Sequence, residues 1–84
     1  MREVVLYGRD GCCLCEEAKE MLERIRTLHP RAFVLRERDI ESDDVLLRRY
    51  LERIPVVEID GVETFELLID ESEVKLRLGI VQPG

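Results

Sequence analysis

The stretch Gly11-Cys12-Cys13-Leu14-Cys15 holds all three cysteines of this 84-residue sequence within four positions. Cys12 and Cys15 form a C-x-x-C pair, a spacing that suits reversible dithiol–disulfide chemistry when it opens a helix. Three cysteines this close together cannot tie distant parts of a chain to one another. The stretch therefore indicates catalytic or metal-binding thiols rather than a structural disulfide.

The residues on either side of this stretch predict a strand followed by a helix. Upstream, residues 3–7 form a short apolar, β-rich run that ends at Gly8, as a buried strand would. Downstream, apolar residues recur at steps of three and four from about Cys13 to His29, and Pro30 ends the helical pattern. The apolar stripe of this helix consists of Leu14, Ala18, Met21, Ile25 and Leu28.

A second strand and a second helix follow. The strand falls within residues 32–40 and turns polar at residues 36–38, which favours a place at the edge of a sheet. Ser42 offers an N-cap for the helix. The buried face of that helix would come from Leu46, Leu47, Tyr50 and Leu51.

The last part of the chain predicts a hairpin and a third helix. Residues 56–59 are strongly apolar, Asp60-Gly61 is typical of a type I′ turn, and residues 62–65 would return antiparallel. Asp70 suits the N-cap of the third helix, and Gly79 suits its C-terminal stop.

This element order, β-α-β-α-β-β-α, predicts one α/β domain over residues 1–84. A right-handed crossover places the first two strands parallel, and the hairpin adds two antiparallel strands on the other side. The result is a four-stranded mixed sheet flanked by three helices. Cys12 then follows the carboxyl end of the first strand, where open α/β sheets place their reactive sites.

Composition disfavours several kinds of partner. Thirteen basic against nineteen acidic residues give a net charge of −6, which argues against nucleic acid. No segment approaches the ~20 apolar residues of a membrane span, and the first residues lack the apolar stretch of a signal peptide. We therefore expect a soluble, cytoplasmic monomer with no membrane partner.

The chain resembles a glutaredoxin-like domain of the thioredoxin superfamily in three features. They are the Val-Val-Leu-Tyr strand, the C-x-x-C that opens a helix, and Ile54-Pro55-Val56 ahead of a hairpin. The resemblance spans essentially the whole chain. It implies a thioredoxin-like, glutaredoxin-type fold and a thiol–disulfide oxidoreductase of cell redox homeostasis. It also implies that Cys12 is the attacking thiol, Cys15 the resolving thiol and Pro55 a cis-proline packed beside the dithiol.

Elementary chemistry agrees with these roles. Unpaired N–H groups and the dipole at a helix entry would stabilise a thiolate at Cys12, and Cys15 lies one turn further, close enough to displace a mixed disulfide. Arg9 would either favour that thiolate and contact the substrate or remain a solvated loop charge. Ile54 and Pro55 would contact the substrate, with the Ile54 backbone free to pair with an incoming peptide. Read without the resemblance, Pro55 is a trans proline of an edge strand.

Three interpretations of Cys13 stay open: an exposed bystander, an alternative resolving or regulatory thiol, or a metal ligand beside Cys12 and Cys15. A closed zinc site takes four ligands, and no second Cys/His cluster completes one within the chain, so we predict no metal site within a single chain and leave open one shared between two chains. His29 lies sixteen residues along the first helix from Cys13. At ~1.5 Å per residue that is about 24 Å, too far for a catalytic Cys–His pair.

The expected partners are a disulfide-bearing protein or small thiol substrate, with a reductase or glutathione as electron donor and no bound cofactor. Glutaredoxins usually carry Gly-Gly and an acidic residue after the hairpin turn, which helps hold glutathione. Here residues 62–67 read Val-Glu-Thr-Phe-Glu-Leu, which would crowd a glutathione carboxylate and disfavour glutathione as co-substrate. Two other functions fit the same thiols: a metal- or iron–sulfur-binding module, and a redox sensor without turnover.

Overall fold

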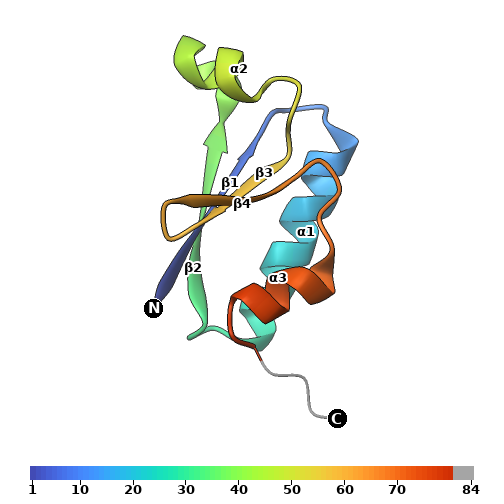
Figure 1. The fold of residues 1–84 in the computed structure, drawn as a ribbon. Helices are drawn as coiled ribbons and strands as arrows, with labels where there is room; N and C mark the ends of the chain where they lie inside the picture. Colours follow the sequence, from blue (N-terminus) through green and yellow to red (C-terminus); the bar gives the residue numbers. More distant parts are fainter. Residues whose placement is uncertain (81–84) are drawn as a thin grey trace.

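Four strands form one mixed sheet in the computed structural model, which describes residues 1–80 (Figure 1). The strand order is β2-β1-β3-β4, with β1 and β2 parallel and the other neighbouring pairs antiparallel. The predicted α/β architecture, with its polar second strand at one edge, is confirmed. In chain order the elements are β1 (Arg2–Gly8), α1 (Cys13–Leu28), β2 (Phe33–Asp39), a short 3₁₀ helix (Ile40–Ser42), α2 (Asp44–Tyr50), β3 (Val56–Ile59), β4 (Val62–Glu66) and α3 (Glu71–Arg77).

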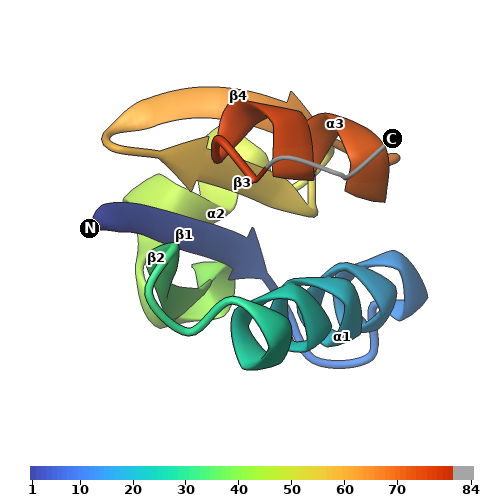
Figure 2. The same cartoon turned by 90° about the horizontal axis from the view of Figure 1, so that it is seen from below.

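Helices α1 and α3 cover the same face of the sheet, as Figures 1 and 2 show. Helix α2 covers the opposite face near the carboxyl end of β1. Within residues 1–80 no helix has the length and apolar character needed to cross a bilayer.

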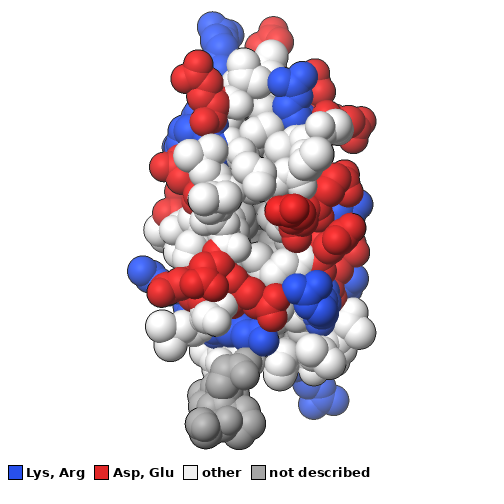
Figure 3. Space-filling view, turned by 90° about the vertical axis from the view of Figure 1, so that its right-hand side faces the viewer, with Lys and Arg blue, Asp and Glu red and all other residues white. Residues whose placement is uncertain are grey.

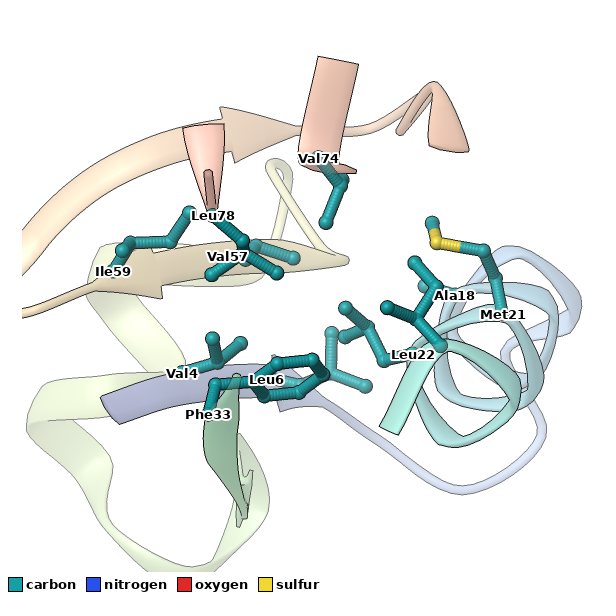
Figure 4. Close-up of a cluster of buried hydrophobic side chains, with 11 residues drawn as sticks. Val4, Leu6, Ala18, Met21, Leu22, Phe33, Val57, Ile59, Val74 and Leu78 are labelled. Carbon is teal, nitrogen blue, oxygen red and sulfur yellow. The ribbon is translucent and has the colours of Figure 1, made fainter. Parts of the chain in front are cut away.

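The larger hydrophobic core fills the space between the sheet and helices α1 and α3 (Figure 4). Successive residues of a strand point to opposite faces, so Val4 and Leu6 of β1 and Val57 and Ile59 of β3 face this core. Full burial of such a side chain contributes about 1.5–3 kcal/mol. The helices and β2 supply Ala18, Met21, Leu22, Ile25, Phe33, Val74 and Leu78.

A smaller cluster lies on the α2 face and includes the buried cysteine. Tyr7 of β1 stacks on Tyr50 of α2 with ring centroids 4.5 Å apart. The other buried members are Val5, Cys15, Ile40, Ile54 and Val56, with Cys12, Leu46 and Leu47 packed against them.

The apolar stripe predicted for the first helix is right in its middle and wrong at its ends. Leu14 is 39% exposed and Leu28 is also exposed, whereas Cys15 and Leu22 are buried. The buried stripe is therefore rotated about one position along the helix. It leaves Leu14 beside the segment between β4 and α3 rather than under the sheet.

The predicted second helix needs two corrections. Its N-cap is Asp43, whose carboxylate accepts the Val45 N–H at 2.8 Å, whereas Ser42 belongs to the 3₁₀ helix and donates its hydroxyl to Asp39. Of its predicted buried face, only Tyr50 is fully buried, and Leu51 is exposed. Leu46 and Leu47 are half-buried against the cluster around Tyr50, and Leu51 lies at the C-cap, past the end of the helix.

The turns confirm the predictions for the rest of the chain. Asp60 and Gly61 have φ of 51° and 84°, the left-handed pair that a type I′ turn requires. Asp70 caps α3 by accepting the Ser72 N–H at 3.0 Å, and Gly79 follows the helix with φ of 75°.

Candidate active site

The dithiol lies where β1 ends and α1 begins. Cys12 is the N-cap residue of α1, and its Sγ accepts a hydrogen bond from the Cys15 N–H at 3.2 Å. The Glu16 N–H donates to the Cys12 carbonyl at 3.0 Å, which closes the first turn of the helix. The sulfur thus takes the place that a serine or aspartate oxygen usually holds at an N-cap, where backbone donors and the helix dipole favour a negative charge.

The three thiols lie in three different environments, and all three are free. Cys12 is half-buried, Cys13 is exposed, and Cys15 is only 6% exposed. This arrangement leaves one half-accessible sulfur at the helix entry and a second sulfur protected beneath it. Within residues 1–80, no three Cys, His, Asp or Glu side chains gather as they would around a metal ion.

Gly8, the last residue of β1, allows the buried thiol to approach the strand. A Cβ placed on Gly8 would lie 3.1 Å from both Cβ and Sγ of Cys15. The close packing of helix against strand, and not an unusual backbone angle, therefore disfavours a side chain at this position.

The pKa of Cys15 is raised to about 12, first by burial and then by the hydrogen bond with Cys12. A backbone hydrogen bond from Arg9 acts in the opposite direction and is weaker. Cys15 is therefore a neutral thiol at physiological pH, whereas the more accessible Cys12 sulfur accepts the hydrogen bond from the Cys15 N–H.

Ile54 and Pro55 immediately precede β3. Their peptide bond is cis, and both residues are buried. Ile54 belongs to the same packed cluster as Cys12 and Cys15. The Ile54 N–H, however, donates to the Tyr50 carbonyl at 3.1 Å. The expectation that the whole Ile54 backbone is free to pair with a peptide is therefore wrong for its N–H, because the chain leaving α2 uses that donor itself.

Arg9 has a surface partner. Its guanidinium lies 3.5 Å from the Glu41 carboxylate, and both side chains are more than a third exposed. An ion pair this open to solvent has little energetic weight. Of the two interpretations of Arg9, the geometry favours the solvated charge, and its backbone rather than its guanidinium contacts the buried thiol.

A polar network between β4 and the end of α2 was not predicted from the sequence. Glu63 of β4 accepts hydrogen bonds from the Tyr50 hydroxyl at 2.8 Å, from Arg53 at 2.6 Å and from Arg49 at 3.1 Å. Arg53 also binds Glu66 at 2.6 Å. These contacts lower the pKa of Glu63, with Arg53 as the largest cause, and tie β4 to the segment that leads into Pro55. The signal was present as arginines at helical spacing in residues 49–53 and glutamates in residues 63–66.

A hollow of about 360 Å³ opens beside the dithiol, between α1 and the segment that joins β4 to α3. Its lining runs from Leu14 and Pro55 to Asp70 and Glu71. Figure 3 faces this side of the molecule and shows uncharged surface in its upper part, bordered mainly by acidic side chains to the right and below. A second hollow of about 260 Å³ lies on the β2 side of α1 and reaches Cys15 between charged residues.

The fold and this cysteine site define a thioredoxin-like class of protein. The chain belongs to the glutaredoxin-like domain family (DUF836), whose family model matches residues 3–79. The resemblance noted from the sequence is therefore confirmed. No curated protein matches the chain.

Solved structures agree with this placement. Protein Ne2328 from Nitrosomonas europaea is 29% identical, with a TM-score of 0.73, over 90% of this chain and 89% of its own. Protein XcR50 from X. campestris is 28% identical, with a TM-score of 0.72, over 94% of this chain and 99% of its own. A mutant thioredoxin from Halobacterium salinarum, 17% identical over 92% of this chain and 71% of its own, shares the fold with a TM-score of 0.68.

Proposed function

We propose that this protein is a thiol–disulfide oxidoreductase in which Cys12 attacks and Cys15 resolves. The observation that carries the proposal is the Cys12 sulfur at the N-cap of α1, 3.2 Å from the Cys15 N–H and above a buried second thiol. Membership of the glutaredoxin-like family supports a redox role for this cysteine pair.

The reaction begins with the thiolate of Cys12. It attacks one sulfur of a substrate disulfide, so that a Cys12–substrate bond forms and the substrate's own S–S bond breaks. The first substrate thiolate leaves and takes up a proton from solvent. The half-accessible position of Cys12 suits this step, because the attacked sulfur must reach it.

Cys15 then completes the exchange. It loses its proton and attacks the Cys12 sulfur of the mixed disulfide, which releases the second substrate thiol. The substrate gains two electrons and two protons, and the protein is left with a Cys12–Cys15 disulfide. A separate reductase, or glutathione, restores the dithiol in the cytoplasm.

The unequal environments of the two thiols give each a distinct step. Burial keeps Cys15 protonated in the resting protein, so that it does not compete for incoming disulfides. Once Cys12 is bonded to substrate, the neighbouring thiol is held one helical turn away at high effective concentration.

A disulfide-reduction assay with dithiothreitol as reductant tests the proposal. We expect Cys12→Ser to abolish turnover. In a separate single-turnover reaction without dithiothreitol, Cys15→Ser should accumulate a mixed disulfide that mass spectrometry detects. Cys13→Ser is the matched control, since it removes an exposed thiol of the same helical turn and should retain activity. Undiminished turnover in Cys12→Ser would overturn the proposal. Stoichiometric metal retained on three unreactive thiols would point to a carrier instead.

A further inference from the structure

The hollow beside the dithiol is lined by apolar side chains, part of whose surface the fold leaves in solvent. We call it the leucine groove and define it by its buried floor, Met21 and Pro55, and by the more exposed Leu14, Leu67, Leu68 and Ile69. Three of these are large side chains held partly or largely in solvent: Leu14 is 39%, Leu67 45% and Leu68 80% exposed. Its volume of about 360 Å³ lies within the range of ligand-binding pockets, about 300–1,000 Å³.

The backbone holds Leu67 in place. Leu67 has φ of 65°, a left-handed conformation that is strained for a residue with a side chain. Its N–H donates to the Pro55 carbonyl at 2.9 Å, which ties the groove wall to the residue beside the dithiol. A glycine would fit this backbone without strain, yet the chain carries a partly exposed leucine at this position.

The rim of the groove is acidic, and part of that charge is uncompensated. Glu71 is already paired with Arg24 at 2.6 Å and with Lys75 at 3.1 Å. Glu17 is exposed on α1 beside Leu14 and has no ion pair among residues 1–80. Asp70 accepts the Ser72 N–H with one carboxylate oxygen and forms no ion pair among residues 1–80. With a net charge of −6 on the chain, this rim attracts cations and repels anions.

We propose that the leucine groove binds a segment of a disulfide-bearing partner protein with a large apolar side chain next to its half-cystine and a lysine or arginine just beyond. The apolar side chain would lie among Leu14, Leu67 and Leu68, and the cation would face Glu17. Glutathione, with two carboxylates and no large apolar side chain, is a poor occupant. This inference rests on the proposed oxidoreductase function.

Matched peptide disulfides test the specificity. Three peptides of equal length would carry Leu-Lys, Leu-Glu or Ser-Lys after the half-cystine, and glutathione disulfide would be the fourth substrate. We expect kcat/KM for the Leu-Lys peptide to exceed that for Ser-Lys about tenfold, the usual range for one apolar side chain in a pocket. The advantage over Leu-Glu should be roughly threefold and should shrink in high salt. Glutathione disulfide should be the slowest.

Paired variants locate the effect in the groove. Leu68→Ser should reduce the preference for leucine over serine, whereas Leu76→Ser, at a 72% exposed position of α3 outside the groove, should leave it unchanged. Glu17→Gln should remove the preference for lysine over glutamate. Glu20→Gln, on the same helix away from the groove, is its control.

The outcomes separate the two proposals. Reduction of all peptides at equal kcat/KM, or fastest reduction of glutathione disulfide, would overturn the groove assignment and leave the oxidoreductase proposal standing. Failure to reduce any disulfide would overturn both. A preference that survives in Leu68→Ser and Glu17→Gln would place the recognition site elsewhere on the molecule.

Discussion

The two faces of the sheet are stabilised in different ways. The face under α1 and α3 is a continuous apolar core of eleven buried side chains (Figure 4). The face under α2 holds a smaller cluster, in which two stacked tyrosines are bordered by hydrogen bonds to glutamates and by two arginines over the Tyr50 ring. Cys12 and Cys15 both pack with the second face.

Because of this difference, the face under α1 and α3 mainly stabilises the domain, whereas the face under α2 mainly shapes the cysteine site. Close apolar packing stabilises the domain but offers few groups that can change charge. The α2 face encloses a thiol and fixes the strand next to it through directional hydrogen bonds, each worth about 0.5–1.5 kcal/mol. We therefore expect substitutions on the first face to alter stability most, and substitutions on the second to alter the site as well.

The largest expected contrast is the reactivity of the thiols. With a pKa of about 12, Cys15 is deprotonated at pH 8 in roughly one molecule in ten thousand. Iodoacetamide should therefore label exposed Cys13 readily and leave Cys15 unmodified in the folded, reduced protein, as peptide mass spectrometry would show. In urea all three cysteines should react alike. Rapid labelling of Cys15 in the folded protein would contradict a sealed α2 face.

Leu22→Ala should produce the largest loss of stability. Leu22 is fully buried in the α1/α3 core, and truncation of such a leucine costs about 2–5 kcal/mol. Urea unfolding followed by circular dichroism would measure the loss. Leu76→Ala, on the exposed side of α3, is the control and should change stability by no more than about 0.5 kcal/mol. Equal losses in both variants would contradict the assigned core.

Glu63→Gln should weaken the α2 face by about 1 kcal/mol at pH 7, because its charged hydrogen bonds with Arg53 and Arg49 are lost. The pKa of Glu63 is lowered in the folded protein, so its contribution is present above the unfolded value of about 4.3. That contribution disappears as the pH falls through the lower folded value. The unfolding free energies of wild type and variant should therefore converge as the pH falls below the unfolded value and through the lower folded one.

A difference that persists unchanged in acid would show that Glu63 acts by shape rather than by charge. Glu52→Gln, at an exposed position between α2 and β3, is the matched control and should be neutral across the same pH range.

The same contrast between the two faces explains which parts of the structure could be predicted from the sequence. The α1/α3 face was predictable because period-2 strands and a 3.6-period helix mark buried positions directly, and the turn at Asp60-Gly61 has its own chemistry. The C-x-x-C pair was predictable because its spacing carries its chemistry. The polar network was not, because the partners of Glu63 come from another element and depend on a register shift between β3 and β4.

The remaining predictions were wrong because neighbouring groups compete for the same hydrogen-bond partners. Ser42 and Asp43 both suit an N-cap, and the 3₁₀ helix that uses Ser42 leaves the cap to Asp43. The Ile54 N–H was expected to be free, but the end of α2 supplies an acceptor at the Tyr50 carbonyl. Such choices between nearby partners depend on the three-dimensional path of the chain.

The smallest expected effect is an energetic coupling between Gly8 and Cys15, which lie where the two faces of the sheet meet. Gly8→Ala would place a Cβ 3.1 Å from Cβ and Sγ of Cys15, and overpacking of this kind costs about 1–3 kcal/mol. In a Cys15→Ala background the sulfur is absent, so the penalty of Gly8→Ala should be smaller, as a double-mutant cycle of unfolding free energies would show. An equal penalty in both backgrounds would mean that the strand, and not the thiol, resists the added methyl group. A reduced penalty would show that contact with the Cys15 sulfur is the reason β1 ends in glycine.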